Sequence, residues 1–168
     1  MTLEELNRLP PEHAQAEFLK CCGSTRWADA LSEARPFVKA DELFTKADDI
    51  WWSLREDDWL EAFRAHPKIG EAKAAGTQSE QARAWSAQEQ SGVAKASAQT
   101  TDELARRNRE YEDRFGFIFI VCASGKSSEE MLAILNSRFD SDRETEIRVA
   151  AKEQRKITRL RLEKLVNQ

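Results

Sequence analysis

The sequence has few of the residues from which metal sites and disulfide frameworks are built. Three cysteines and two histidines occur among its 168 residues. Cys21 and Cys22 are adjacent and Cys122 lies in an apolar run, a spacing that matches neither a zinc site nor a set of disulfides. No motif of acidic residues suggests a metal site either. We therefore expect no bound metal, and the odd number of cysteines favours a cytoplasmic location.

Long apolar segments are missing as well. No apolar run approaches the roughly 20 residues that a helix needs to cross a bilayer. The first residues lack the basic and apolar regions of a signal peptide. The net charge of −4 at pH 7 argues weakly against a protein dedicated to nucleic acid. We expect a cytoplasmic protein that binds neither a membrane nor a nucleic acid.

Signals for the start of a helix recur along the chain. Four segments fit the capping box, in which a Ser or Thr and a Glu three residues later satisfy each other's backbone N–H groups. These segments begin at Thr2, Thr100, Ser127 and Ser141. The 33% of charged and 40% of hydrophobic residues are typical of a globular protein. The length favours a single domain covering residues 1–168.

Three further helices are expected in the first 65 residues. They cover approximately residues 11–22, 25–35 and 42–65. A proline begins the first of these helices and a serine caps the second. Asp41 is expected to cap the third, whose apolar residues recur at three- and four-residue steps. The third helix is expected to break near Arg55.

Residues 115–123 depart from the helical pattern. They are apolar and rich in β-branched and aromatic side chains, which is typical of a strand, but no second segment of this kind exists to pair with them. We interpret them as an extended or irregular stretch, or as the buried start of a helix. A buried extended stretch leaves main-chain N–H and C=O groups for side chains, water or a small polar molecule. The predicted fold is an all-α, single-domain bundle of about eight helices with one buried extended apolar segment.

The most informative motif is His66-Pro67-Lys68-Ile69-Gly70-Glu71. A proline keeps the residue before it out of the helical region, so His66 is expected at a break between helices. An imidazole has an unperturbed pKa close to neutral, which suits proton transfer. The alternative is a histidine at a helix end without a chemical role.

A second polar cluster follows at residues 86–90. If this segment is helical, Ser86, Glu89 and Gln90 lie on one face of the helix. A solvated face is the ordinary interpretation of three such groups. Trp85 and Val93 flank the cluster, however, so the segment is not uniformly polar.

The last predicted helix, from Ser141 to about Asn167, has one apolar and one basic face. Arg161 falls on the apolar face, where a buried guanidinium needs an anionic partner. The partner is either a structural carboxylate or the carboxylate of a substrate, unless the side chain extends outward to water. The opposite face is basic, interrupted by glutamates that include Glu146, and a plain solvated face is the ordinary interpretation of it.

Four segments resemble, in order and spacing, the 2-oxo-4-hydroxy-4-carboxy-5-ureidoimidazoline (OHCU) decarboxylase family. They are His66-Pro67 with Ile69-Gly70, Ser86 with Glu89-Gln90, Arg114 to Ala123, and Lys156-Ile157 with Leu160-Arg161-Leu162. The resemblance covers nearly the whole chain. It implies an all-α homodimer that decarboxylates the unstable imidazoline to (S)-allantoin in urate degradation, with no metal or organic cofactor.

The resemblance also implies a set of site residues. Its catalytic residues match His66, Glu89 and Arg161. Its substrate-binding residues match Pro67, Ser86, Gln90, Phe119, Ile120, Val121, Cys122 and Ala123. We therefore expect a small-molecule substrate that carries a carboxylate.

Two other functions remain open from the sequence. A non-catalytic helical adaptor could bind an acidic partner through the basic face of the last helix, and charge reversal at Arg155 and Arg159 would then abolish its function. A degenerate family member could bind a purine-derived ligand without turnover. Such a protein would bind allantoin but would not change the optical rotation of a urate-oxidation mixture.

Overall fold

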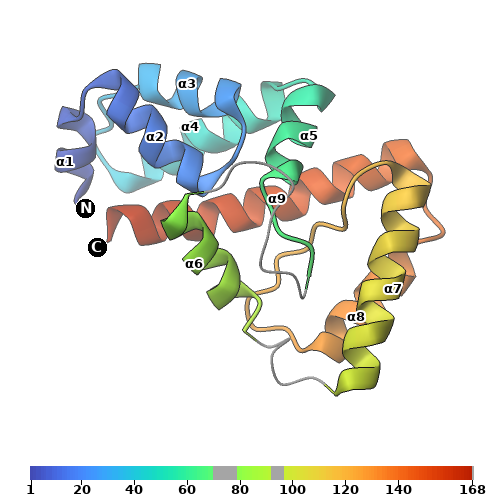
Figure 1. The fold of residues 1–168 in the computed structure, drawn as a ribbon. Helices are drawn as coiled ribbons and strands as arrows, with labels where there is room; N and C mark the ends of the chain where they lie inside the picture. Colours follow the sequence, from blue (N-terminus) through green and yellow to red (C-terminus); the bar gives the residue numbers. More distant parts are fainter. Residues whose placement is uncertain (70–78, 92–96, 168) are drawn as a thin grey trace. The chain divides into compact units, whose positions relative to one another are not determined.

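The computed structural model describes residues 1–69, 79–91 and 97–167, and the regular secondary structure within them consists of helices, with no strand. The helices are α1 (Leu3–Arg8), α2 (Pro11–Cys21), α3 (Thr25–Glu33), α4 (Ala40–Ser53), α5 (Glu56–Arg64), α6 (Glu80–Glu89), α7 (Ala98–Phe115), α8 (Ser128–Arg138) and α9 (Arg143–Val166) (Figure 1). The predicted all-α fold is confirmed, with nine described helices where about eight were expected. None of these helices is long and apolar enough to cross a membrane.

The chain divides into two compact units. The first unit comprises Met1–Ala62 and Arg155–Gln168, and the second comprises Phe63–Gln154. Helices α5 and α9 each contribute residues to both units. The motif around His66, helix α6 and residues 115–123 all belong to the second unit.

An apolar core formed by α2, α3 and α4 holds the first unit together. Phe18 and Trp27 are fully buried and meet edge to face, with 6.2 Å between their ring centroids. The indole N–H of Trp27 donates to the Ala47 carbonyl at 3.0 Å, so the only polar atom of this side chain is satisfied in the core. The ring therefore links α3 to both of its neighbours.

Capping by polar side chains determines where several helices begin. The capping boxes at Thr2 and Ser127 are confirmed. Those at Thr100 and Ser141 are wrong, because α7 is capped by Ser97 and the first turn of α9 by Asp142. The Asp142 carboxylate accepts from the Thr145 N–H at 2.8 Å, and its charge also suits the positive end of the helix.

The predicted helix over residues 42–65 is interrupted as expected. It forms α4 and α5, separated at Leu54 and Arg55, and the carboxylate of Asp58 accepts from the Arg55 N–H at 3.1 Å. The expected cap at Asp41 is wrong. Helix α4 begins at Ala40, which places Asp41 in its first turn, where its negative charge favours the helix dipole.

Residues 117–123 form a mostly buried, non-helical stretch between α7 and α8 (Figure 1), as predicted, whereas Phe115 of the predicted segment is the last residue of α7. Gly116 ends α7 with a left-handed φ of 81°, a conformation in which a Cβ atom would be strained. After this turn, Phe117 and Phe119 both meet the ring of Tyr111 edge to face, at 5.9 and 5.5 Å. Aromatic packing therefore holds the stretch against α7.

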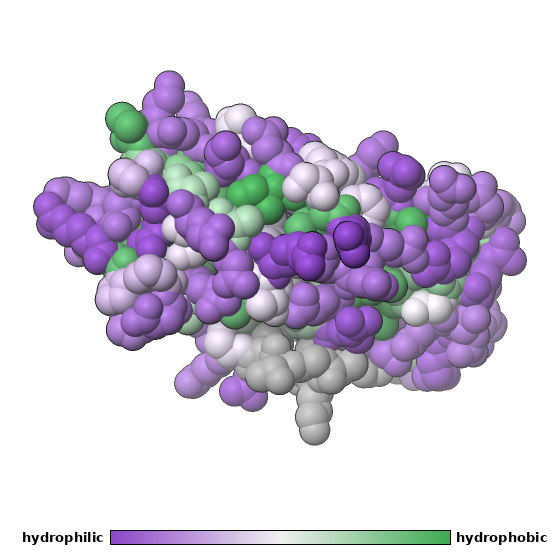
Figure 2. Space-filling model, turned by 90° about the horizontal axis from the view of Figure 1, so that it is seen from above, coloured by the Kyte–Doolittle hydropathy of each residue, from purple (hydrophilic) through white to green (hydrophobic). Residues whose placement is uncertain are grey.

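The surface is mostly hydrophilic on the face drawn in Figure 2, with smaller hydrophobic patches between polar residues. Among the described residues, the large hydrophobic side chains that are exposed are Val38 and Trp52. Isolated exposed residues of this kind are ordinary on a folded protein.

Candidate active site

His66 lies just after the end of α5, at the predicted break between helices. The main-chain N–H of His66 donates to the Phe63 carbonyl at 3.1 Å and closes a turn. Pro67 then prevents the helix from continuing. His66 is only 9% exposed, and the next residue, Pro67, is also buried. The backbone therefore holds this imidazole in a defined place, while Gly70 of the motif lies outside the described residues.

The imidazole of His66 has a partner that sequence reasoning missed. Its Nε2 lies 2.6 Å from the side-chain oxygen of Gln154, on α9. Gln154 is fully buried, next to the buried Ala150 and Ala151. A lone amide on an apolar helix face must find a hydrogen-bond partner, and this signal could have revealed Gln154, although the sequence does not reveal the partner.

The polar cluster of α6 is not a solvated face. Ser86 and Glu89 are both buried, and Gln90 is half-buried at the C-cap. The Glu89 carboxylate also influences the pKa of Cys122, a residue of the non-helical stretch. Burial raises the pKa of the Cys122 thiol, and the negative charges of Glu153 and Glu89 raise it further. Glu89 is therefore a buried carboxylate close enough to residues 117–123 to influence their electrostatics.

Side chains of α8, α9 and the turn before α8 hold the main chain of the stretch. Arg138 donates to the Ile120 carbonyl at 2.5 Å, and the Cys122 N–H donates to the Glu153 carboxylate at 2.9 Å. Lys126 donates to the Cys122 carbonyl at 2.7 Å. Both main-chain groups of Cys122 thus have partners within the protein.

Two neighbouring main-chain donors differ from Cys122. Ile120 and Val121 are buried, yet neither of their N–H groups donates a hydrogen bond to any residue in the described parts of the chain. A buried N–H group without a partner is costly in free energy.

Behind this stretch lies a buried charged cluster of Tyr111, Arg138 and Glu146. The phenol of Tyr111 and the Nε of Arg138 both donate to one oxygen of Glu146. Burial raises the pKa of Tyr111, which keeps the phenol protonated as a donor. Glu146 was expected among the charged surface residues of the last helix, and this is wrong because its side chain is fully buried. Sequence periodicity alone could not identify its partners.

Arg161 belongs to the first unit, on the face of α9 that also buries Ile157 and Leu165. It is 3% exposed, so the alternative in which its side chain extends outward to water is wrong. Burial raises the pKa values of Cys21 and Cys22, and the Arg161 charge acts in the opposite direction on both thiols. The guanidinium is thus a buried charge beside the end of α2.

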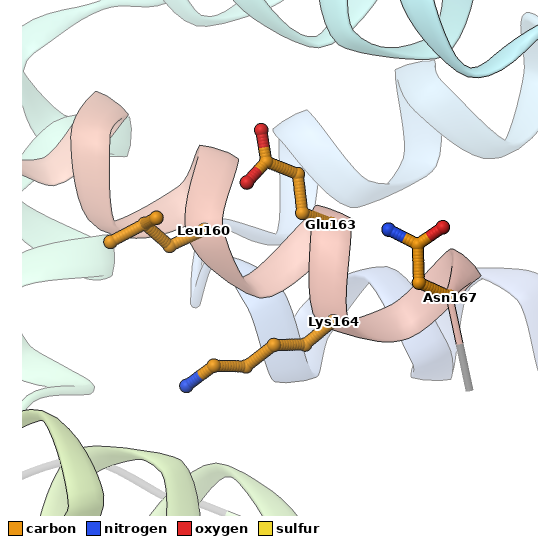
Figure 3. Close-up of a pocket in the computed structure, with 4 residues that line it drawn as sticks. All are labelled: Leu160, Glu163, Lys164 and Asn167. Atoms are coloured by element: carbon orange, nitrogen blue, oxygen red, sulfur yellow. The ribbon is translucent and has the colours of Figure 1, made fainter.

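The last turns of α9 carry a surface groove of about 440 Å³ (Figure 3). It is lined by Leu160, Glu163, Lys164 and Asn167, and none of these four is among the predicted site residues. Within the described residues, no group of three or more His, Cys, Asp or Glu side chains is arranged to hold a metal ion.

Comparison with known proteins identifies the family. The model of the OHCU decarboxylase family matches residues 7–163. The chain is 41% identical over 155 residues to the uric acid degradation bifunctional protein TTL of Arabidopsis thaliana, covering 92% of this chain and 48% of that protein. It is 27% identical over 168 residues to the uric acid degradation bifunctional protein PucL of Bacillus subtilis (strain 168), covering 99% of this chain and 33% of that protein. The chain therefore spans about half and one third of the lengths of these two relatives.

A solved structure agrees with these matches. An OHCU decarboxylase crystallised in the presence of (S)-allantoin superposes with a TM-score of 0.78 and 41% identity, covering 90% of this chain and 98% of that one. The resemblance to this family that the sequence suggested is confirmed. The four motifs, the match over residues 7–163 and these relatives together show that the chain belongs to the OHCU decarboxylase family.

Proposed function

We propose that this chain catalyses the cofactor-independent decarboxylation of OHCU to (S)-allantoin in urate degradation. The observation that carries the proposal is the buried imidazole of His66, held by Gln154 in the same unit as the buried carboxylate of Glu89. The relative crystallised in the presence of (S)-allantoin supports this product.

The chemistry of the substrate explains why side chains are sufficient. Loss of CO2 leaves an electron pair on the carbon that carried the carboxylate, and the adjacent C=N bond of the imidazoline ring, conjugated to the 2-oxo group, can delocalise it. The protein has to hold the carboxylate out of the ring plane, stabilise the resulting negative charge and deliver a proton to one face of the ring. Delivery to one face determines which enantiomer of allantoin forms.

In this proposal His66 is the acid–base residue. It takes the proton of the substrate hydroxyl, whose carbon becomes a carbonyl, or delivers a proton to the neighbouring ureido-bearing carbon, which receives the electron pair left by CO2. A position fixed by Pro67 and by the contact with Gln154 limits proton transfer to one direction. Glu89 orients either the imidazole or the substrate.

The developing negative charge needs donors and a cation. We assign this role to the N–H groups of Ile120 and Val121 and to the guanidinium of Arg161. The support for Arg161 is its burial as a cation on α9, and the support for the two N–H groups is their lack of partners in the described parts of the chain. The remaining substrate contacts are assigned to Pro67, Ser86, Gln90, Phe119, Cys122 and Ala123.

The direct test is the substitution His66→Gln, followed by circular dichroism of the allantoin formed. We expect the variant to lose most of the acceleration, by about 100-fold or more, because a positioned acid or base typically contributes that much. The matched control is His13→Gln, which changes the other histidine, an exposed residue of α2. If His66→Gln still forms (S)-allantoin at the normal rate, the assignment of His66 is wrong.

Assembly and location follow the family expectation. We propose that residues 1–168 form one functional domain and that the protein is a homodimer in the cytoplasm. The family match over residues 7–163, which includes residues of both units, supports a single domain. Light scattering after size-exclusion chromatography measures the mass, which we expect to be about twice that of the 19.2 kDa chain.

The adaptor alternative has less support. Two cations of the basic face have partners within the chain, because Arg155 pairs with Asp48 and Arg159 with Glu163. Arg159 also lies 3.7 Å from the ring centre of Phe44. Both arginines therefore already interact with residues of their own unit, which gives less support to a role in binding an acidic partner.

A further inference from the structure

Gln154 is a buried amide in contact with the residue assigned to proton transfer. Its oxygen lies 2.6 Å from Nε2 of His66, although 88 positions separate the two residues in the sequence. Both residues belong to the second unit, so the contact is internal to one compact body. Gln154 is fully buried, which removes competition from water for this hydrogen bond.

The geometry determines which nitrogen of the imidazole carries the proton. A neutral imidazole has one N–H donor and one nitrogen with a lone pair. A carboxamide oxygen can only accept, so Nε2 of His66 must donate to Gln154. The lone pair is then on Nδ1, which becomes the basic nitrogen of the ring.

The contact also leaves the charge of the site unchanged. A carboxylate at this position would favour the protonated imidazolium, because an opposite charge stabilises the charged form. A neutral amide fixes the ring without adding a charge. An amide therefore suits a histidine that must both take up and release a proton.

We propose that Gln154 is a positioning residue that holds His66 as the Nε2–H tautomer and thereby makes Nδ1 the nitrogen that exchanges the proton. This inference rests on the proposed function for its catalytic consequence. The tautomer itself is a property of the folded protein and can be measured without substrate.

The experiment is a long-range proton–nitrogen NMR spectrum of the histidine rings, recorded at a pH where both are neutral. The chain has two histidines, so the exposed His13 serves as the internal reference. We expect His66 to be almost entirely the Nε2–H tautomer. A wild-type spectrum dominated by the Nδ1–H tautomer would overturn the proposal, and this measurement requires no variant to fold.

Two substitutions separate positioning from simple packing. Gln154→Met keeps a similar length but removes the acceptor, so we expect a mixture of tautomers and a kcat about tenfold lower or more, with KM within about twofold. Gln154→Glu keeps an acceptor, so the neutral ring should retain the Nε2–H tautomer, while the imidazolium should persist to a higher pH than in the wild type. Unchanged kcat and an unchanged tautomer in folded Gln154→Met would refute the role of Gln154.

The two readouts also distinguish this inference from the proposed function. If the wild-type protein makes no (S)-allantoin, the proposed function fails, while the NMR spectrum still decides whether Gln154 fixes the tautomer. If the protein is active but the tautomer is Nδ1–H, only the inference about Gln154 fails.

Discussion

The two units of the chain differ in what they bury. Within the described residues, the buried polar side chains of the first unit are Ser24, Ser32, Thr158 and Arg161. Those of the second unit are His66, Ser86, Glu89, Asn108, Ser128, Arg138, Glu146 and Gln154. Buried polar groups cost free energy unless they form hydrogen bonds, so the second unit has more buried groups that need partners than the first.

The second unit itself contains two kinds of buried polar contact. Arg138 and Glu146 form a charged pair that holds the carbonyl of Ile120, a contact that serves the scaffold. The contact of His66 with Gln154 is neutral and orients a group capable of chemistry. Removal of the first contact should therefore destabilise the unit, whereas removal of the second should mainly alter the reaction.

The largest effect is expected from Glu146→Ala. It leaves the guanidinium of Arg138 buried without its carboxylate, which should lower the free energy of unfolding by about 3–5 kcal/mol. Urea denaturation followed by circular dichroism measures the loss. The control is Glu163→Ala, which breaks an exposed pair with Arg159 and should cost less than about 1 kcal/mol. Equal losses in the two variants would contradict the scaffold role of the cluster.

The next effect concerns the charged residue buried in the first unit. Arg161→Gln should lower kcat/KM for OHCU by about 100-fold, because it removes a cation assigned to the developing negative charge. Steady-state rates measured by circular dichroism give the ratio. Arg155→Gln on the same helix is the matched control, since its partner is the partly exposed Asp48, and it should leave the rate unchanged. Normal kcat/KM in Arg161→Gln would remove this residue from the site.

A smaller effect tests the beginning of α7. Ser97→Ala removes the side chain that accepts from the Thr100 N–H, so the free energy of unfolding should fall by about 1 kcal/mol. Thr100→Ala leaves that cap in place and should cost less. A larger loss of unfolding free energy in Thr100→Ala than in Ser97→Ala would instead support the capping box predicted at Thr100.

The smallest expected effect is a low rate of reaction of the three buried thiols with a thiol reagent at pH 8. The thiolate is the reactive form, and burial raises the pKa of Cys22 to about 11 and the pKa values of Cys21 and Cys122 above their usual range. A thiol reagent should therefore react slowly with the native protein and faster as the pH rises toward 11. All three thiols should react quickly once the protein is unfolded, and fast reaction of the native protein at pH 8 would contradict this burial.

The sequence predicts the helix starts at Thr2 and Ser127 correctly, and both hydrogen bonds of the capping box form there. The predictions failed at Thr100 and Ser141 because another capping residue lies one to three positions away and makes the hydrogen bond instead. A short motif records which residues can cap a helix, but it does not decide between neighbours.

The same limit applies to the candidate site. The break at His66, the non-helical stretch and the burial of Arg161 could be predicted because proline, β-branched residues and helical periodicity act locally. Gln154 could be identified as a polar residue on an apolar face, but its contact with His66 joins distant parts of the chain. The partners of Arg138 likewise depend on packing that no single segment encodes.

The most direct test of the account is to add the wild-type protein to freshly hydrolysed 5-hydroxyisourate and to follow the circular dichroism of the product. We expect rapid formation of allantoin as one enantiomer, (S)-allantoin, because a fixed imidazole delivers the proton to one face of the ring. Formation of racemic allantoin at the rate of the uncatalysed reaction would contradict the account.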